Sequence, residues 1–375
     1  MRVLIVSGIW PPDVGGPASH APDVAGHLAA SHEVTVVTTA DRPPAGRPYR
    51  VRFTSRGLPT GVRHVVSLAE IARRAAAADV IYSTGMFARS AIASRLVGTP
   101  LVVKLTGDPA FERLRARGEF HGDVEDFAGA RSPRADALRR LRDLTVRRAS
   151  AIVCPSSYIR DLAIAWGIPA DRVSVVPNPA PDVGALAGRE QLRHKHGMEA
   201  PTVLFAGRLT AQKDLGTLLE AVARDGDAPS VVIVGDGPER EPLEVRAREL
   251  DLGERVAFWG PRPRGEVLEL MRAAEATVLP SAWENFPHSV VESLAVGTPV
   301  VASRTGGVAE VVTDGHNGLL LDPSDPDALS GALRRVVREP ELVERLRGSA
   351  PGSVDHLAAA ALYGDIENLL EQHAA

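Results

Sequence analysis

Short runs of β-branched and other apolar residues alternate along the chain with segments of helical period. In the first half of the sequence such runs lie at 2–8, 32–39, 49–55, 79–85, 100–107, 151–157 and 173–178. Most of them are followed by segments rich in Ala, Leu and Arg with helical spacing. This alternation is typical of a parallel sheet with helices on both faces.

A second series of the same kind follows a break in the pattern. Its runs lie at 202–209, 230–238, 255–261, 276–281, 299–307 and 318–322, and the break at 177–190 is rich in Pro, Gly and Ala. A chain of 375 residues also exceeds the size at which one hydrophobic core usually stops growing. We therefore predict an α/β protein with two parallel-sheet domains, 1–180 and 181–352, and a final helical segment, 353–375. Ligands of such sheets bind beyond the carboxyl ends of the strands, so two facing domains would enclose a cleft.

Composition excludes several classes of partner and site. The formal net charge of -4 gives no general attraction to nucleic acid. The single cysteine, Cys154, allows no intrachain disulfide and no zinc site built from several thiolates. No run approaches the roughly 20 apolar residues of a membrane span. We expect a cytoplasmic protein that does not bind nucleic acid.

The loop after the first apolar run carries two adjacent glycines, Gly15 and Gly16. Glycines between a strand and a helix let the backbone approach a ligand closely, and the amino end of the helix favours an anion. An ordinary strand-to-helix turn is the alternative. The dinucleotide fingerprint Gly-x-Gly-x-x-Gly follows none of the strands, which argues against a nicotinamide or flavin enzyme.

The segment "FAGRLTAQKDLGTLLEA", 205–221, places Arg208 and Lys213 just after a predicted strand. Cations beside a helix amino terminus can bind a diphosphate. The chain has only three lysines, Lys104, Lys195 and Lys213, among 43 basic residues, so a lysine in this loop suggests a need for its compact charge. The alternative is a pair of ordinary surface residues.

The segment "WENFPHSVVESLAVGTPVV", 283–301, contains two glutamates, Glu284 and Glu292. Pro287 suits the first turn of a helix and Gly297 suits its end, which predicts a helix over 287–296 with Glu284 before it and Glu292 inside it. The backbone amides of Asn285, Phe286 and the first turn would then face phosphate oxygens. Carboxylates beside a diphosphate require that the ligand also carry hydroxyl groups. A nucleotide sugar has hydroxyls on both sides of its diphosphate.

The second half of the chain resembles the family 4 glycosyltransferases of the GT-B fold. The motifs "FAGRLTAQKDLGTLLEA", "VIVGDGPEREPLE", "VAFWGPRPRGEV", "LPSAWENFPHSVVESLAVGTPVVASRTGGVAEVV" and "GHNGLLLDPSDPDALSGAL" occur in that family's order. The resemblance is strong over 200–340 and weaker in the first half, where "GGPASH" and "HEVTVVT" carry it. It implies two Rossmann-like domains facing a central cleft, the first binding the acceptor and the second the donor. It also implies transfer of a sugar from a UDP- or GDP-linked donor, with retention of configuration and without a metal or other cofactor.

The resemblance also implies a role for individual residues. Arg208 and Lys213 would hold the diphosphate, Glu284 the hydroxyls of the donor sugar, and Glu292 the ribose hydroxyls. Further donor contacts would come from Gly15, Gly16, Gly260 to Arg262, and the amides of Asn285, Phe286 and the neighbours of Pro287. The last helix would cross back to the first domain.

The acceptor side departs from the family. Many relatives carry a histidine after the strand that corresponds to "LVVKLTGDPAFE", whereas this chain has Gly107 followed by Asp108. Asp108 would then orient the acceptor hydroxyl as part of the catalytic set. The alternative is a turn-forming residue before Pro109.

Other functions stay open at this level. A GT-B nucleotide-sugar epimerase would share the sheets and the cleft, and a non-catalytic sugar-nucleotide binding protein would share the donor residues. The acceptor classes are envelope polysaccharide, glycolipid and natural product. The arginine-rich segment 131–150 is interpreted as a solvated helix face. The alternative is a peripheral contact with an anionic membrane or a lipid phosphate.

Overall fold

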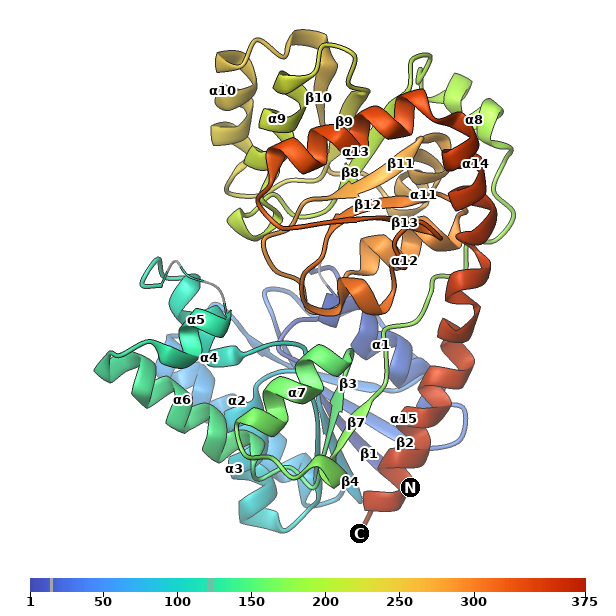
Figure 1. Ribbon diagram of the computed structural model, residues 1–375. Coiled ribbons are helices and arrows are strands. Elements are labelled where there is room, and N and C mark those ends of the chain that lie inside the picture. Colours follow the sequence, from blue (N-terminus) through green and yellow to red (C-terminus); the bar gives the residue numbers. More distant parts are fainter. Residues whose placement is uncertain (14–15, 121, 123) are drawn as a thin grey trace. The chain divides into compact units, whose positions relative to one another are not determined.

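The computed structural model describes residues 1–13, 16–120, 122 and 124–375 (Figure 1). The chain forms two compact units. The first comprises Met1–Asn178 together with Ala360–Ala375, and the second comprises Pro179–Ala359. The boundaries expected from the sequence, at 180 and 353, lie close to those of the two units.

The first unit contains a seven-stranded parallel sheet in the order β3-β2-β1-β4-β5-β6-β7. Its strands are β1 (Arg2–Val6), β2 (Glu33–Ala40), β3 (Arg50–Ser55), β4 (Val80–Ser83), β5 (Leu101–Lys104), β6 (Ala151–Cys154) and β7 (Val173–Val175). In the central strand β1, Val3 pairs with Val34 on one side and with Val80 on the other. Leu4 and Val6 of this strand lie in a hydrophobic core that also contains buried residues from the helices.

Most helices of the first unit lie between its strands in sequence, and the last one follows the second unit. They are α1 (Gly16–Leu28), α2 (Thr60–Ala75), α3 (Phe87–Val97), α4 (Pro109–Arg115), α5 (Val124–Gly129), α6 (Pro133–Val146), α7 (Ser157–Ala165) and α15 (Ala359–His373). Capping side chains mark the amino termini of several of these helices. Ser132 and Ser156, for example, accept hydrogen bonds from the first turns of α6 and α7.

The second unit contains a six-stranded parallel sheet in the order β10-β9-β8-β11-β12-β13. Its strands are β8 (Thr202–Ala206), β9 (Ser230–Val234), β10 (Val256–Gly260), β11 (Ala276–Leu279), β12 (Val300–Ser303) and β13 (Gly318–Leu321). Its helices are α8 (Arg189–Lys195), α9 (Leu215–Arg224), α10 (Arg240–Glu249), α11 (Arg264–Ala273), α12 (His288–Ala295), α13 (Pro326–Arg338) and α14 (Pro340–Ser349).

The α/β class with two parallel sheets is confirmed. Every apolar run identified in the sequence contains a strand, because each run is short, β-branched and bounded by turn residues. The final helix α15 belongs to the first unit, where Glu367 contacts His27 and Ser31. Among the described residues, no helix combines the length and apolar character that crossing a membrane requires.

Candidate functional site

The strand order of the second unit marks where a ligand is expected. The chain runs from β8 outward to β9 and β10, then returns to the other side of β8 to form β11. At such a reversal the loops after the two central strands diverge and leave a crevice at the carboxyl ends of the strands. Those loops are 207–214 and 280–287, and they contain Arg208, Lys213 and Glu284.

The loop that carries Arg208 is braced by the loop after β9. The backbone N–H of Leu209 donates to the Asp236 carbonyl at 2.9 Å. A Cβ on Gly235 would lie 1.8 Å from the Gly207 carbonyl oxygen, and one on Gly237 would lie 2.1 Å from that of Leu209, so only glycine fits at either position. Arg208 itself is exposed and forms no hydrogen bond or ion pair with another described residue.

Backbone contacts join the loops after β8 and β11. The N–H of Ala282 donates to the Gln212 carbonyl at 2.9 Å, and the Gln212 side-chain amide donates to the Trp283 carbonyl at 3.0 Å. These two hydrogen bonds hold residues 212 and 283 side by side. Their chain neighbours, Lys213 and Glu284, therefore also meet.

Lys213 and Glu284 form a direct ion pair. The Lys213 ammonium donates to Glu284 Oε1, which also accepts from the Ser281 hydroxyl at 2.7 Å. Glu284 is 5% exposed, and its other oxygen, Oε2, has no hydrogen bond to a described residue. The ammonium balances the buried charge and leaves one carboxylate oxygen able to accept a hydrogen bond from a hydroxyl group.

Helix α12 begins at His288, one residue later than the sequence predicts, and Glu284 and Glu292 lie before and within it as expected. No described side chain caps its amino terminus. Asn285 is half-buried and Phe286 is buried just before the helix. Gly297 has a φ of +82°, which suits the end of the helix.

Glu292 has a partner that the sequence analysis missed. Its carboxylate lies 3.0 Å from the Arg264 guanidinium at the start of α11. Burial raises the pKa of Glu292 above its ordinary value, and the positive charge of Arg264 offsets part of that rise. Gly260, which precedes this helix, has a φ of +72°. Arg262 lies over the Trp259 ring, with 6.0 Å between the guanidinium carbon and the ring centroid.

The remaining predicted residues lie in the first unit. Gly15 lies outside the described residues, and Gly16 is the first residue of α1. Of the two interpretations of Asp108, the structure shows the structural one. Asp108 Oδ1 accepts hydrogen bonds from the Ala110 and Phe111 amides at the start of α4, at 2.8 and 3.3 Å.

The second oxygen of Asp108 is also occupied. Oδ2 lies 2.5 Å from the Arg142 guanidinium, and both side chains are buried. Arg142 also stacks over the Trp166 ring at 4.0 Å and donates to Asp143 at 2.9 Å. These contacts and the burial of Asp108 show a structural role, as the cap of α4 and the partner of Arg142. Its role toward an acceptor hydroxyl stays a prediction.

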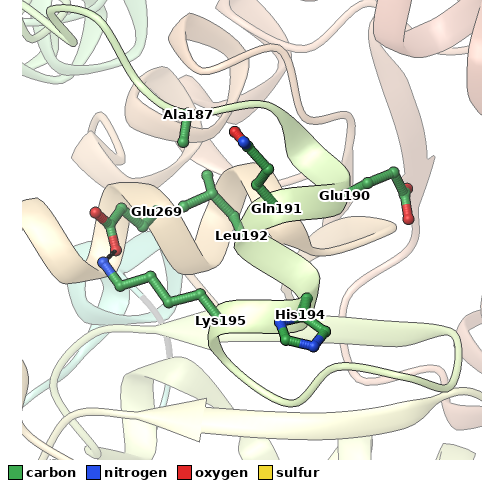
Figure 2. Close-up of a pocket in the computed structure, with 7 residues that line it drawn as sticks. All are labelled: Ala187, Glu190, Gln191, Leu192, His194, Lys195 and Glu269. Carbon is green, nitrogen blue, oxygen red and sulfur yellow. Dashed lines mark hydrogen bonds and ion pairs between the residues drawn. The ribbon is translucent and has the colours of Figure 1, made fainter.

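One surface pocket of the second unit contains none of the predicted residues. Figure 2 shows its lining, which comes from α8, α11 and the linker and comprises Ala187, Glu190, Gln191, Leu192, His194, Lys195 and Glu269. Lys195 and Glu269 form an ion pair of 2.6 Å within it. No strand-end loop contributes to this pocket, so it lacks the chemistry found beside β8 and β11.

Comparison with known proteins identifies relatives of both halves. Residues 188–352 match the family model described as glycosyl transferases group 1, and residues 15–179 match that described as glycosyl transferase 4-like domain. The D-inositol 3-phosphate glycosyltransferase of Nocardiopsis dassonvillei is 31% identical over 76% of this chain and 67% of its own length. The α-D-kanosaminyltransferase of Streptomyces kanamyceticus is 29% identical over 71% of this chain and 69% of its own length.

Solved structures with this fold match nearly the whole chain. Anabaena Alr3699/HepE in complex with UDP-glucose gives a TM-score of 0.81 at 22% identity and covers 99% of this chain and 100% of its own. Sucrose-phosphate synthase from Thermosynechococcus elongatus gives 0.82 at 20% identity, covering 99% and 98%. These likenesses confirm the predicted class of two Rossmann-like domains.

The Asp108–Arg142 pair leads to a prediction about stability. Replacing Asp108 with Ala leaves the Arg142 charge buried without its main partner and removes the cap of α4, so we expect a loss of about 3–5 kcal/mol in the free energy of unfolding. Asp143→Ala removes the half-buried partner of the same arginine and should cost about 1 kcal/mol or less. Urea unfolding of both variants makes the comparison. Equal, small losses would contradict the structural role of Asp108.

Proposed function

The chain belongs to the family 4 glycosyltransferases of the GT-B fold, and on that basis we propose that it is a retaining, metal-independent enzyme that transfers a sugar from a nucleoside diphosphate to an acceptor hydroxyl. The observation that carries the proposal is the Lys213–Glu284 ion pair at the strand reversal of the second unit. In this proposal the Lys213 ammonium binds phosphate, and Oε2 of Glu284 beside it accepts hydrogen bonds from hydroxyl groups. The family matches support a transferase rather than an epimerase or a non-catalytic binding protein.

The diphosphate site in this proposal combines three sources of positive charge. Arg208 is exposed and has no partner among the described residues, so its guanidinium can turn to a phosphate without breaking an ion pair. Lys213 supplies the second cation. The amino end of α12, which no described side chain caps, supplies N–H donors and the positive end of the helix dipole.

The two glutamates divide the hydroxyl groups of the donor. Oε2 of Glu284 would accept from the transferred sugar, because Oε1 is already engaged by Lys213 and Ser281. Glu292 would accept from the ribose. Its partner Arg264 is largely exposed, so this ion pair can open or shift when the ribose binds. As the family resemblance implies, Gly16 would contact the diphosphate, and the segment 260–262 would lie near the base.

The proposed reaction is a same-face displacement. The bond between the anomeric carbon and the diphosphate oxygen breaks, the acceptor oxygen bonds to that carbon from the same side, and the departing phosphate oxygen takes the acceptor proton. Arg208 and Lys213 stabilise the charge that develops on the leaving group. Glu284, held by Lys213 and Ser281, is committed to binding rather than to forming a glycosyl adduct. Two cations and the helix amides supply the charge that a metal ion would otherwise bring.

We further propose a small polyhydroxylated acceptor of the glycolipid or natural-product type. The names of the relatives support this choice, since one is a D-inositol 3-phosphate glycosyltransferase and another an α-D-kanosaminyltransferase. The donor base is uracil or guanine.

A peripheral membrane contact is the last part of the proposal. Leu141 and Leu144 on α6 are 44% and 74% exposed, and Ile92 and Leu96 on the neighbouring helix α3 are also exposed. Exposed arginines lie on or next to the same two helices, namely Arg95, Arg134, Arg140, Arg147 and Arg148. An apolar surface surrounded by basic residues suits an anionic bilayer. The interpretation of 131–150 as only a solvated face accounts less well for the exposed leucines.

The donor is identified by a thermal-shift panel of UDP-, GDP- and dTDP-sugars. At about 100 times Kd, the matching donor should stabilise the protein by roughly 2.7 kcal/mol. Transfer is then measured as nucleoside diphosphate release that depends on added acceptor. Binding without acceptor-dependent release, or conversion of the donor into its epimer, would contradict a transferase.

Replacing Arg208 or Lys213 with Ala should slow turnover more than it destabilises the fold. We expect an increase of about 2–4 kcal/mol in the activation barrier, because both cations meet charge that grows in the transition state. Lys195→Ala is the matched control, since Lys195 lies on α8 away from the strand ends. Near-normal turnover in both site variants would rule out this diphosphate site.

The two glutamates should respond differently to substitution. Glu292→Ala loses the ribose contact and should weaken nucleoside diphosphate binding about tenfold, or about 1.4 kcal/mol. Glu284→Ala should slow transfer while leaving that affinity unchanged or tighter, because it frees Lys213. Calorimetric titration of the nucleoside diphosphate alone decides the matter. Equal weakening in the two variants would show that the roles are not divided in this way.

Retention and metal independence are tested in one assay. NMR of the first-formed product should show the anomeric configuration of the donor, and excess EDTA should leave the initial rate intact. An inverted product would overturn the same-face course. A rate that falls with EDTA and recovers with Mg²⁺ or Mn²⁺ would overturn metal independence.

Co-sedimentation with vesicles tests the membrane contact. The protein should bind anionic vesicles more than zwitterionic ones, and Leu141→Ser with Leu144→Ser should reduce that binding. Val245→Ser, at an exposed apolar position of α10 in the second unit, is the control. Vesicle binding that is absent, or equal in all variants, would contradict this part of the proposal.

A further inference from the structure

Three potential metal ligands converge in the first unit, on elements far apart in the sequence. They are His32, just before β2, and Glu367 and Glu371 on α15. One ligand atom from each lies within 4.8 Å of the others. We infer that these side chains form a binding site for a divalent transition-metal ion of the zinc type, which fastens α15 to the first unit.

The geometry of the three groups suits such an ion. Glu367 and Glu371 are four residues apart on a helix, so both side chains project from the same face. His32 Nε2 lies 2.8 Å from Glu367 Oε1 and 3.6 Å from Glu371 Oε1. A tetrahedral ion with bonds of about 2.0–2.1 Å holds neighbouring ligand atoms about 3.3 Å apart. Small side-chain shifts would therefore bring all three atoms onto one ion.

The Nε2 atom of His32 faces both carboxylates without the geometry of a hydrogen bond to either. Its side chain is only 8% exposed, yet Nε2 forms no hydrogen bond with a described residue despite its distance from Glu367. Buried polar atoms normally have a hydrogen-bond partner, and a bound cation would satisfy this one. The other ring nitrogen, Nδ1, lies 3.4 Å from the amino group of Met1.

Neighbouring side chains orient the carboxylate of Glu367. The Ser31 hydroxyl donates to Oε1 at 2.6 Å, and His27 Nε2 lies 2.9 Å from Oε2. Hydrogen bonds of this kind orient carboxylates that bind a metal ion. Glu371 is 53% exposed, so water can reach the ion and complete its coordination.

The donor set selects the class of metal. One imidazole with two carboxylates suits Zn²⁺ and its transition-metal neighbours. Mg²⁺ requires a nearly regular octahedron of oxygen ligands and binds imidazole poorly. The site lies on α15 and beside β2, and none of its residues belongs to the proposed donor site. Ion pairs alone, without a metal, are the alternative explanation of the cluster.

Calorimetric titration of the chelator-treated, full-length protein with ZnCl₂ tests the inference. We expect about one Zn²⁺ per chain and a higher melting temperature in its presence. Glu371→Gln should weaken Zn²⁺ binding at least tenfold, since it removes a ligand on an exposed position that the fold does not depend on. Asp365→Asn, on the same helix and also exposed, is the matched control and should bind as the parent does.

Mg²⁺ provides the second comparison and should bind much more weakly than Zn²⁺. His32→Gln should abolish tight Zn²⁺ binding. If this substitution of a buried residue prevents folding, Glu371→Gln still tests the inference. Equal Zn²⁺ affinity in the parent and Glu371→Gln would overturn the inference. So would Zn²⁺ binding that is absent from the parent, or binding that Mg²⁺ matches.

Discussion

The proposed donor site depends on the ion pair between Lys213 and Glu284. A carboxylate that is 5% exposed needs a cation beside it, and that cation comes from a different loop, 71 residues away. The two backbone-linked loops and the ion pair therefore support one another. The pair also resolves a conflict in the chemistry, because a glutamate beside a diphosphate would repel it unless a positive charge lay between them.

The sequence was sufficient to predict the framework of the site. The apolar runs located the strands, and the Pro and Gly residues around 287 and 297 located α12 to within one residue at each end. These signals are local, because they reflect backbone preferences and burial within a few residues. The strand order then follows from general rules of parallel sheets, and it puts the loops after β8 and β11 at one edge.

The sequence was not sufficient to predict which side chains meet. Asp108 and Arg142 are 34 residues apart, and nothing near either one indicates that they share a buried ion pair. The same holds for Arg264 with Glu292 and for His32 with Glu367. Asp108 shows the consequence, since its position after a strand suggested an acceptor contact and gave no sign of the buried pair with Arg142. Long-range pairs depend on how whole elements pack, and they leave no local pattern.

The most direct measurement of the central claim is a crystal structure of the full chain with its nucleoside diphosphate bound. The account predicts diphosphate oxygens within about 3 Å of Lys213 Nζ and of the Arg208 guanidinium, with Glu284 still beside Lys213 and turned away from the phosphates. A diphosphate bound elsewhere would contradict it, for example in the pocket between α8 and α11. So would a diphosphate that leaves Lys213 without a phosphate contact.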